Sequence, residues 1–285
     1  MKPPVSWVMA LALGCASAPR VSEADKADFD RIWRLYRSGD QSWPEERDRW
    51  LAKRGESKDI LIENLLADML RTQSIRDPSK PAPWVRPQQE LAQLGDDVLA
   101  YALTTMSIRS TDEVALDRCV ELLVLMKASK AVQQAYATSV AASDVDDARP
   151  KNYRKALVRA AARIDRDEGQ DVLVAALKRD PSWEVRAAAV GQAGAAGAPS
   201  ARVQAAVVSA LADADWFVAA KAAEACARLK LMAAVPSLVD LLERATQATR
   251  LRECEVTVQA LKSLTGRHDL TSSPAQWRAV LKVGG

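Results

Sequence analysis

Residues able to carry acid–base, nucleophilic or metal chemistry are sparse in this chain. Its single histidine, His268, lies in a polar turn, so a metal site or a Ser–His pair would lack the second partner it needs. The four cysteines show neither a Cys-x-x-Cys nor a Cys/His spacing. Cys119, Cys226 and Cys254 each occur among apolar residues at helical spacing, which predicts small buried side chains. In an exported protein, Cys226 and Cys254 could instead pair as a disulfide.

Other patterns typical of catalytic sites have a structural interpretation. Acidic pairs occur where turns end and helices begin, a position that favours capping: Asp96–Asp97, Asp112–Glu113 and Asp146–Asp147. The glycines of residues 191–197 have nearly the spacing of a phosphate-binding loop, but they end a helical stretch with no strand before it. We therefore expect a non-enzymatic protein with no cofactor, no metal and no small-molecule substrate.

Charge and aromatic residues suggest surfaces for binding rather than for catalysis. The net charge is +3, from 40 basic and 37 acidic residues, which gives no electrostatic case for nucleic acid. Basic residues gather at 151–186, but acidic residues lie among them and predict a solvated mixed-charge face. Trp183 and Trp216 recur at equivalent positions, which favours packing between neighbouring units and leaves a binding stripe as the alternative. With Arg186, they are the candidate binding surface.

Helices must position these residues, because apolar side chains return at helical spacing from Phe29 onward and strand-like alternation is absent. Proline, glycine and aspartate interrupt the pattern at short intervals, and four prolines fall within residues 77–87. Short helices joined by turns are the expected result.

Two of these helical units repeat one another. Asp180, Trp183 and Val185 recur as Asp213, Trp216 and Val218 at a constant offset of 33 residues. In both copies an apolar helix precedes the aspartate and an alanine-rich helix follows it. The aspartate is expected to cap that second helix, and the alanines to let neighbouring helices approach closely. A single pair of helices cannot bury its apolar face, whereas stacked pairs can.

This unit resembles the HEAT-repeat family. The pattern Asp-x-x-x-x-Val-Arg-x-x-Ala is complete from Asp180 to Ala189 and partial from Asp213, where Ala219 replaces the arginine. The resemblance implies an all-α fold, a right-handed α-solenoid of HEAT-like helical pairs over 28–285. The clearest repeats are predicted at 150–265, followed by a C-terminal cap at 266–285, in which Trp277 is expected to cover the end of the core.

The N-terminal residues resemble the lipobox of bacterial lipoproteins. Lys2 and a short apolar run at 5–13 precede Gly14 and Cys15, and the run is too short to span a bilayer. The resemblance implies a signal peptide at 1–14, cleavage between Gly14 and Cys15, lipidation of Cys15 and a tether at 15–27. Ala16, after the cysteine, implies the outer membrane. The alternatives are unlipidated secretion, with a cut after Ala18 that Pro19 disfavours, and a cytosolic chain.

Together these features predict a lipid-anchored protein of the cell envelope, facing the periplasm, that acts as a scaffold for a protein partner. This expectation is an inference from the fold. Some HEAT-like proteins are bilin lyases or DNA glycosylases, and that enzymatic alternative applies if the chain is cytosolic. A third possibility is that the tryptophans bind envelope polysaccharide.

Overall fold

The structure, a computed structural model, describes residues 23–53, 58–71, 81–142, 148–164, 167–195 and 199–283. Within these residues every regular element is a helix, and the fold is the predicted all-α solenoid of HEAT-like pairs. The chain forms two compact units that divide between Tyr101 and Ala102, inside helix α6. None of the described helices is both long and apolar enough to cross a membrane.

The described residues of the first unit form four complete helices and the start of a fifth, and aromatic side chains form much of their core. Phe29 and Trp33 stack with ring centroids 5.7 Å apart, and Trp33 stacks on Tyr36 at 4.7 Å. The first described helix begins at Glu23, so the last five residues of the predicted 15–27 tether are helical. The helices are α2 (Glu23–Ser38), α3 (Trp43–Lys53), α4 (Lys58–Leu70), α5 (Val85–Gln93) and α6 (Asp97–Ile108).

The second unit contains the repeated helical pairs. Its α-helices are α7 (Glu113–Leu125), α8 (Ser129–Ala141), α9 (Ala148–Ile164), α10 (Asp167–Arg179), α11 (Trp183–Ala195), α12 (Ala201–Ser209), α13 (Trp216–Arg228), α14 (Val235–Gln247), α15 (Leu251–Thr265) and α16 (Pro274–Val283). Two short 3₁₀ helices, η2 (Ala210–Ala212) and η3 (Met232–Ala234), join the later pairs.

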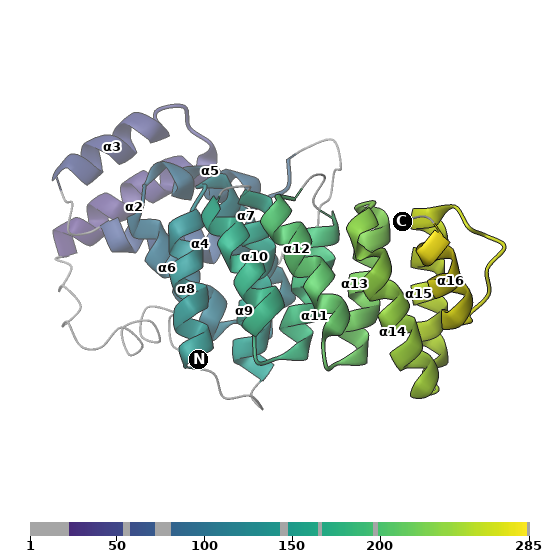
Figure 1. Ribbon diagram of the computed structural model, residues 1–285. Coiled ribbons are helices and arrows are strands. Elements are labelled where there is room, and N and C mark those ends of the chain that lie inside the picture. The colour runs from purple at the N-terminus through teal and green to yellow at the C-terminus, as the bar shows by residue number, and fades with distance from the viewer. Residues whose placement is uncertain are drawn as a thin grey trace. The chain divides into compact units, whose positions relative to one another are not determined.

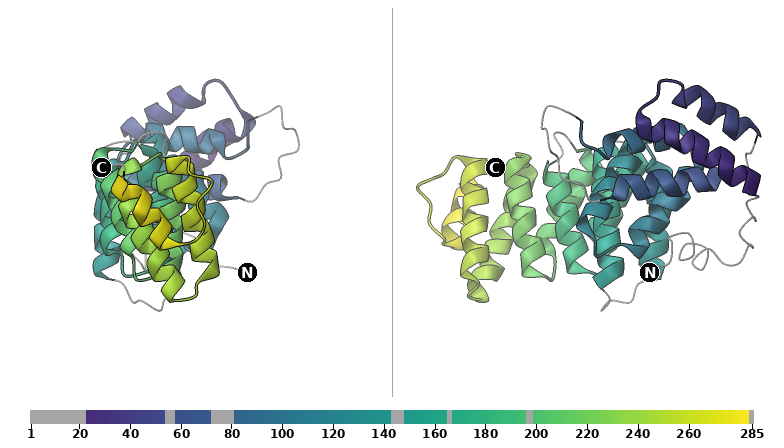
Figure 2. Two further views of the ribbon diagram at one scale, coloured as in Figure 1. Left: turned by 45° about the vertical axis from the view of Figure 1, so that its right-hand side comes forward. Right: turned by 180° about the vertical axis from the view of Figure 1, so that it is seen from behind.

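These helices form two layers, and within each layer successive helices lie next to one another along the unit (Figures 1 and 2). In the first layer α8, α10 and α12 pack in order, and α14 packs against α16. In the second layer α7, α9, α11, α13 and α15 pack in order. Small residues bring neighbouring helices together: a Cβ on Gly169 of α10 would lie 2.5 Å from the Ala161 carbonyl oxygen of α9. The core lies between the layers.

Three turns between helices are built alike. Lys127, Lys230 and Thr249 follow α7, α13 and α14 with φ angles of 53°, 55° and 57°. The left-handed residue lets two successive N–H groups reach back to the last helical turn, as when the Leu231 N–H donates to the Cys226 carbonyl at 3.0 Å. Carbonyls left over at the helix end are thereby satisfied.

At the C-terminal end of the described residues, α16 packs against α14. Gly266, with φ of 71°, ends α15 in the left-handed conformation, and α16 follows after a short loop. Trp277 of α16 is only 1% exposed, and its indole N–H donates to the Thr271 carbonyl at 2.9 Å. The prediction that Trp277 is a packing residue is confirmed.

Candidate functional site

The predicted surface residues Trp183, Trp216 and Arg186 lie at the starts of α11 and α13, within the second unit. The two aspartates of the repeat lie just before these helices. Gly14 and Cys15, the predicted cleavage and lipidation site, lie outside the described residues.

Each repeat aspartate accepts a hydrogen bond from a backbone N–H within its own turn. Asp180 accepts from the Ser182 N–H at 2.9 Å, and Asp213 accepts from the Asp215 N–H at 2.8 Å. Both N–H groups precede the helix, so the predicted capping by these two aspartates is wrong in detail. Asp215 is the residue that caps α13, through the N–H groups of Phe217 and Val218 at 2.9 and 3.3 Å.

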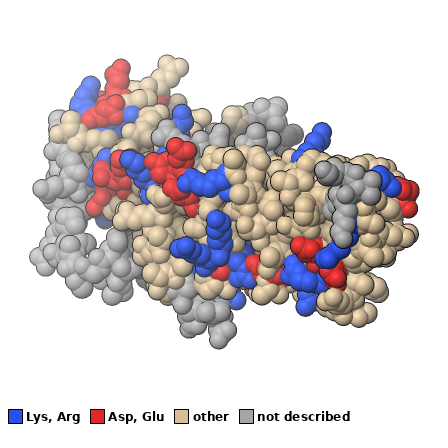
Figure 3. Space-filling model, viewed as in Figure 1, with Lys and Arg blue, Asp and Glu red and all other residues tan. Residues whose placement is uncertain are grey.

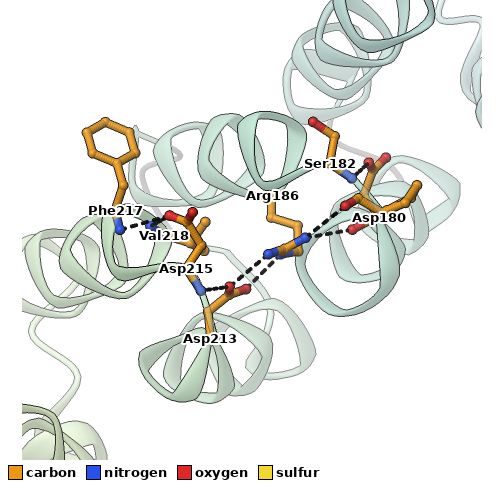
Figure 4. A network of polar contacts seen from close by, with 8 residues as sticks. Asp180, Ser182, Arg186, Asp213, Asp215, Phe217 and Val218 are labelled. Atoms are coloured by element: carbon orange, nitrogen blue, oxygen red, sulfur yellow. Dashed lines mark hydrogen bonds and ion pairs between the residues drawn. The ribbon is translucent and has the colours of Figure 1, made fainter. Parts of the chain in front are cut away.

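Arg186 links two successive repeats (Figure 4). Its Nε and Nη2 donate to the two carboxylate oxygens of Asp213 at 2.7 and 2.8 Å, and Nη1 donates to the Asp180 carbonyl at 3.0 Å. This two-point geometry raises the pKa of Arg186. Burial would raise the pKa of Asp213, but the hydrogen bonds from Arg186 and the Asp215 N–H outweigh it and lower that pKa.

The same link occurs one repeat earlier, where it is fully buried. Arg154 of α9 donates to the Asp180 carboxylate from Nε at 2.8 Å and from Nη2 at 3.1 Å. Their side chains are 1% and 0% exposed. The Tyr136 hydroxyl of α8 donates to Asp180 at 2.7 Å, and burial followed by the nearby Asp180 charge raises the tyrosine pKa. The prediction of a solvated face is therefore wrong for Arg154 and Asp180.

Other basic residues of the predicted face form exposed ion pairs, but with acidic residues of α7 that lie outside 151–186. Arg159 pairs with Asp117 at 2.8 Å, and the Arg163 Nη2 bonds Glu121 at 2.9 Å, with all four side chains partly exposed. On the face drawn in Figure 3, blue basic side chains lie beside red acidic ones. Exposed pairs of this kind contribute about 0–1 kcal/mol each. Their arrangement does not favour a ligand of a single charge sign.

Trp183 and Trp216 form an exposed aromatic cluster with Phe217. The Phe217 ring meets Trp183 edge-on at 5.7 Å between centroids and Trp216 edge-on at 5.8 Å. Trp183 thus contacts the next repeat, as predicted, yet it remains 44% exposed and Trp216 remains 39% exposed. The Lys221 ammonium lies 5.7 Å from the centre of the Phe217 ring. We call Trp183, Trp216 and Phe217 the aromatic cluster.

Sequence reasoning missed two members of this region. Phe217 joins the tryptophans, and a helical projection of Trp216 and its neighbours could have shown that it lies on the adjoining face. Tyr136 completes the buried Asp180 network from 44 residues away. No local pattern marks that contact, because Tyr136 precedes the repeats that the sequence makes clear.

Asp146 and Asp147, a predicted acidic pair, lie outside the described residues, whereas several other predicted residues can be placed. His268 is exposed in its turn, and Asp112 caps α7 through the Ala115 N–H at 3.0 Å. Cys119 and Cys226 are buried free thiols, as predicted, and burial raises the pKa of each to about 12. Cys254 is also free and partly exposed. In the described part of the chain, no three His, Cys, Asp or Glu side chains gather as metal ligands would.

Comparison with known proteins agrees with this architecture. No curated protein matches the chain significantly. Eight chains of solved structures match, among them an engineered protein known from a crystal structure. It is 15% identical and covers 72% of this chain and 96% of its own, with a TM-score of 0.34, too low to inform function. Residues 171–262, from within α10 into α15, match a family model described as HEAT repeats.

Proposed function

We propose that this chain is a non-enzymatic scaffold of the bacterial cell envelope, anchored through a lipid on Cys15, that binds a protein partner. The aromatic cluster is the observation that carries the binding role. Tryptophan is enriched among residues that dominate the energy of protein interfaces, and such residues cluster. Here two tryptophans are held on a rigid pair of helices, with large parts of their rings exposed to solvent.

The repeat link explains why this surface is pre-organised. Arg186 and Asp213 fasten the start of α13 to α11, and Asp215 caps α13 directly beside Trp216 and Phe217. A surface that is ordered before binding loses less conformational entropy when a partner docks.

The proposed anchor follows from the residues around Cys15. Acyl chains on that cysteine would contribute about 0.8 kcal/mol per buried methylene, so a multiply acylated cysteine holds firmly. The lipobox-like residues Gly14 and Cys15 predict export, and Ala16 after the cysteine supports the proposed outer-membrane location facing the periplasm.

One experiment tests the anchor. Cells expressing the wild type and Cys15→Ala are fractionated, and the intact masses of both products are measured. We expect a membrane-bound wild type that begins at acylated Cys15 and an unacylated variant. Cytosolic products that both begin at Met1 would reject the anchor and favour the intracellular enzymatic alternative.

A second experiment tests the aromatic cluster. Partners are crosslinked in intact cells carrying the wild type, Trp183→Ala/Trp216→Ala or the control Met232→Ala. Met232 is 58% exposed and follows the opposite end of α13, so it matches the tryptophans in exposure and apolar character. We expect the double variant alone to lose the crosslinked partner. Partner capture that survives the double variant would refute this surface, and tryptophan-dependent retention on envelope polysaccharide would favour the glycan alternative.

A further inference from the structure

A hollow of about 420 Å³ lies on the second layer, across α7, α9 and α11. Its volume falls within the range of sites that bind small ligands or short peptide segments. Two small residues at equivalent repeat positions, Ala156 of α9 and Ala188 of α11, contribute to its lining. One repeat later the same position is Lys221 of α13, whose long side chain pairs with Glu224 at 2.8 Å. Small residues at this repeat position therefore leave space for the hollow at α9 and α11, whereas the long Lys221 side chain occupies that position at α13.

The charges around the hollow are divided between helices. Glu113 and Asp117 line it from α7, whereas Lys155 and Arg159 line it from α9. One side therefore offers carboxylates and the next offers cationic groups. A polyanion would meet the carboxylates of α7, so this division disfavours nucleic acid and phosphate-rich ligands.

A ligand can replace the ion-pair partners around the hollow at a low cost in free energy. The Arg159–Asp117 pair is 37% and 60% exposed, and Lys155 lies 3.7 Å from Glu184. Exposed pairs contribute about 0–1 kcal/mol, so a ligand bearing both charge signs can replace these partners with little loss.

Unsatisfied polar atoms occur beside the hollow. Ser110 lines it and is 1% exposed, yet its hydroxyl has no hydrogen-bond partner. The buried Nε of Arg159 also has none. A buried polar group without a partner is destabilising, but these two atoms have almost no accessible surface, so a ligand in the hollow cannot reach them as the side chains lie. Asn152 and Gln192 add amide groups, which suit the alternating donors and acceptors of an extended backbone.

We infer that this hollow binds an extended segment of a partner protein in which basic and acidic side chains alternate. Successive side chains of an extended chain point to opposite sides, so basic residues would face α7 while acidic residues face α9. The backbone between them would bond the amides of Asn152 and Gln192. The inference rests on the proposed protein-binding function, but it concerns a different surface from the aromatic cluster.

The test uses a fluorescent, acetylated peptide in which lysine and glutamate alternate. Its control has the same composition, with the lysines and glutamates in two separate blocks. Binding to the purified protein is followed by fluorescence anisotropy at physiological ionic strength, which weakens non-specific attraction. We expect saturable binding of the alternating peptide and much weaker binding of the block peptide.

Matched variants locate the site. Gln192→Ala should weaken binding by about fivefold, the effect of one hydrogen bond. Lys155→Glu should also weaken binding, whereas Lys130→Glu, the same charge change on exposed α8, should not. Trp183→Ala should leave peptide binding intact, which separates this inference from the aromatic cluster. The inference is overturned if the two peptides bind equally, if neither binds, or if Gln192→Ala and Lys155→Glu have no effect.

Discussion

Two junctions of the second unit use the same Arg–Asp link in different surroundings. Between α9 and α11 the pair is Arg154 with Asp180, whose side chains are at most 1% exposed. Between α11 and α13 the pair is Arg186 with Asp213, whose side chains are 17% and 9% exposed. The repeat therefore produces the same Arg–Asp geometry at both junctions, and the stability that each pair contributes depends on how deeply it is buried.

The buried junction needs a further partner that the other lacks. Asp180 accepts from Arg154, the Tyr136 hydroxyl and the Ser182 N–H, which together satisfy a carboxylate removed from water. Asp213 has Arg186 and one backbone N–H. A third copy is missing because Ala219 of α13 replaces the arginine. The difference indicates that the Arg154–Asp180 link fixes the packing of successive repeats more firmly than the Arg186–Asp213 link does.

The largest expected effect is the loss of the buried carboxylate. Asp180→Ala leaves the Arg154 charge buried and unpaired, and we expect it to lower the free energy of unfolding by about 3–5 kcal/mol. Asp213→Ala is the matched variant and should cost about 1.5–3 kcal/mol, because Arg186 can reach water. Urea unfolding followed by circular dichroism measures both. Equal losses at the two positions would contradict the comparison.

Removal of the tyrosine hydroxyl sharpens the comparison further. Tyr136→Phe keeps the ring but deletes the bond to Asp180, so we expect a loss of about 1–2 kcal/mol. Tyr153 of α9 supplies the control, because burial alone raises its pKa to about 12. Tyr153→Phe should change the free energy of unfolding by less than Tyr136→Phe in the same urea titrations. A larger effect at Tyr153 would mean that the hydrogen bond from Tyr136 to Asp180 adds no stability beyond that of an ordinary buried tyrosine.

Acid should weaken the more exposed junction in a defined direction. The pKa of Asp213 is lowered in the folded state, so its stabilisation is complete above the unfolded value of about 3.9. That stabilisation is lost as pH falls through the folded pKa. Asp213→Asn should therefore be less stable than the wild type at neutral pH, and the difference should shrink below about pH 4. Thermal unfolding across this range measures it, and a pH-independent difference would show that the carboxylate charge is irrelevant.

The repeated, local part of this structure follows from the sequence. Helical spacing, the Asp180 and Asp213 copies and the position of Trp277 all depend on residues close together in the chain, so the all-α solenoid and the packing of Trp277 were predicted. The start of the first described helix at Glu23 was not, because polar residues at 23–27 carry no apolar periodicity.

The rest depends on contacts that do not repeat. Tyr136 reaches Asp180 from an earlier pair, and the hollow needs α7, whose sequence lacks the repeat pattern. The exposure of Trp183 and Trp216 also required the structure, because the same positions could pack fully between repeats. The pairing of the Arg186 guanidinium with Asp213 also required the structure, because the two residues belong to different repeats.

The smallest expected effect concerns how tightly α11 and α13 pack. A Cβ on Gly194 would lie 3.0 Å from the Ala225 Cβ of α13, whereas a Cβ on Gly191 meets nothing within 4 Å. Alanine is favoured over glycine in a helix by about 0.8–1 kcal/mol, so Gly191→Ala should stabilise the protein by about that amount. Gly194→Ala should gain less or lose stability, because the added methyl overpacks the junction. Urea midpoints of the two variants measure the difference. Equal gains would mean that α11 and α13 are not closely packed there, which would leave the Arg186–Asp213 pair as the main tie between these repeats.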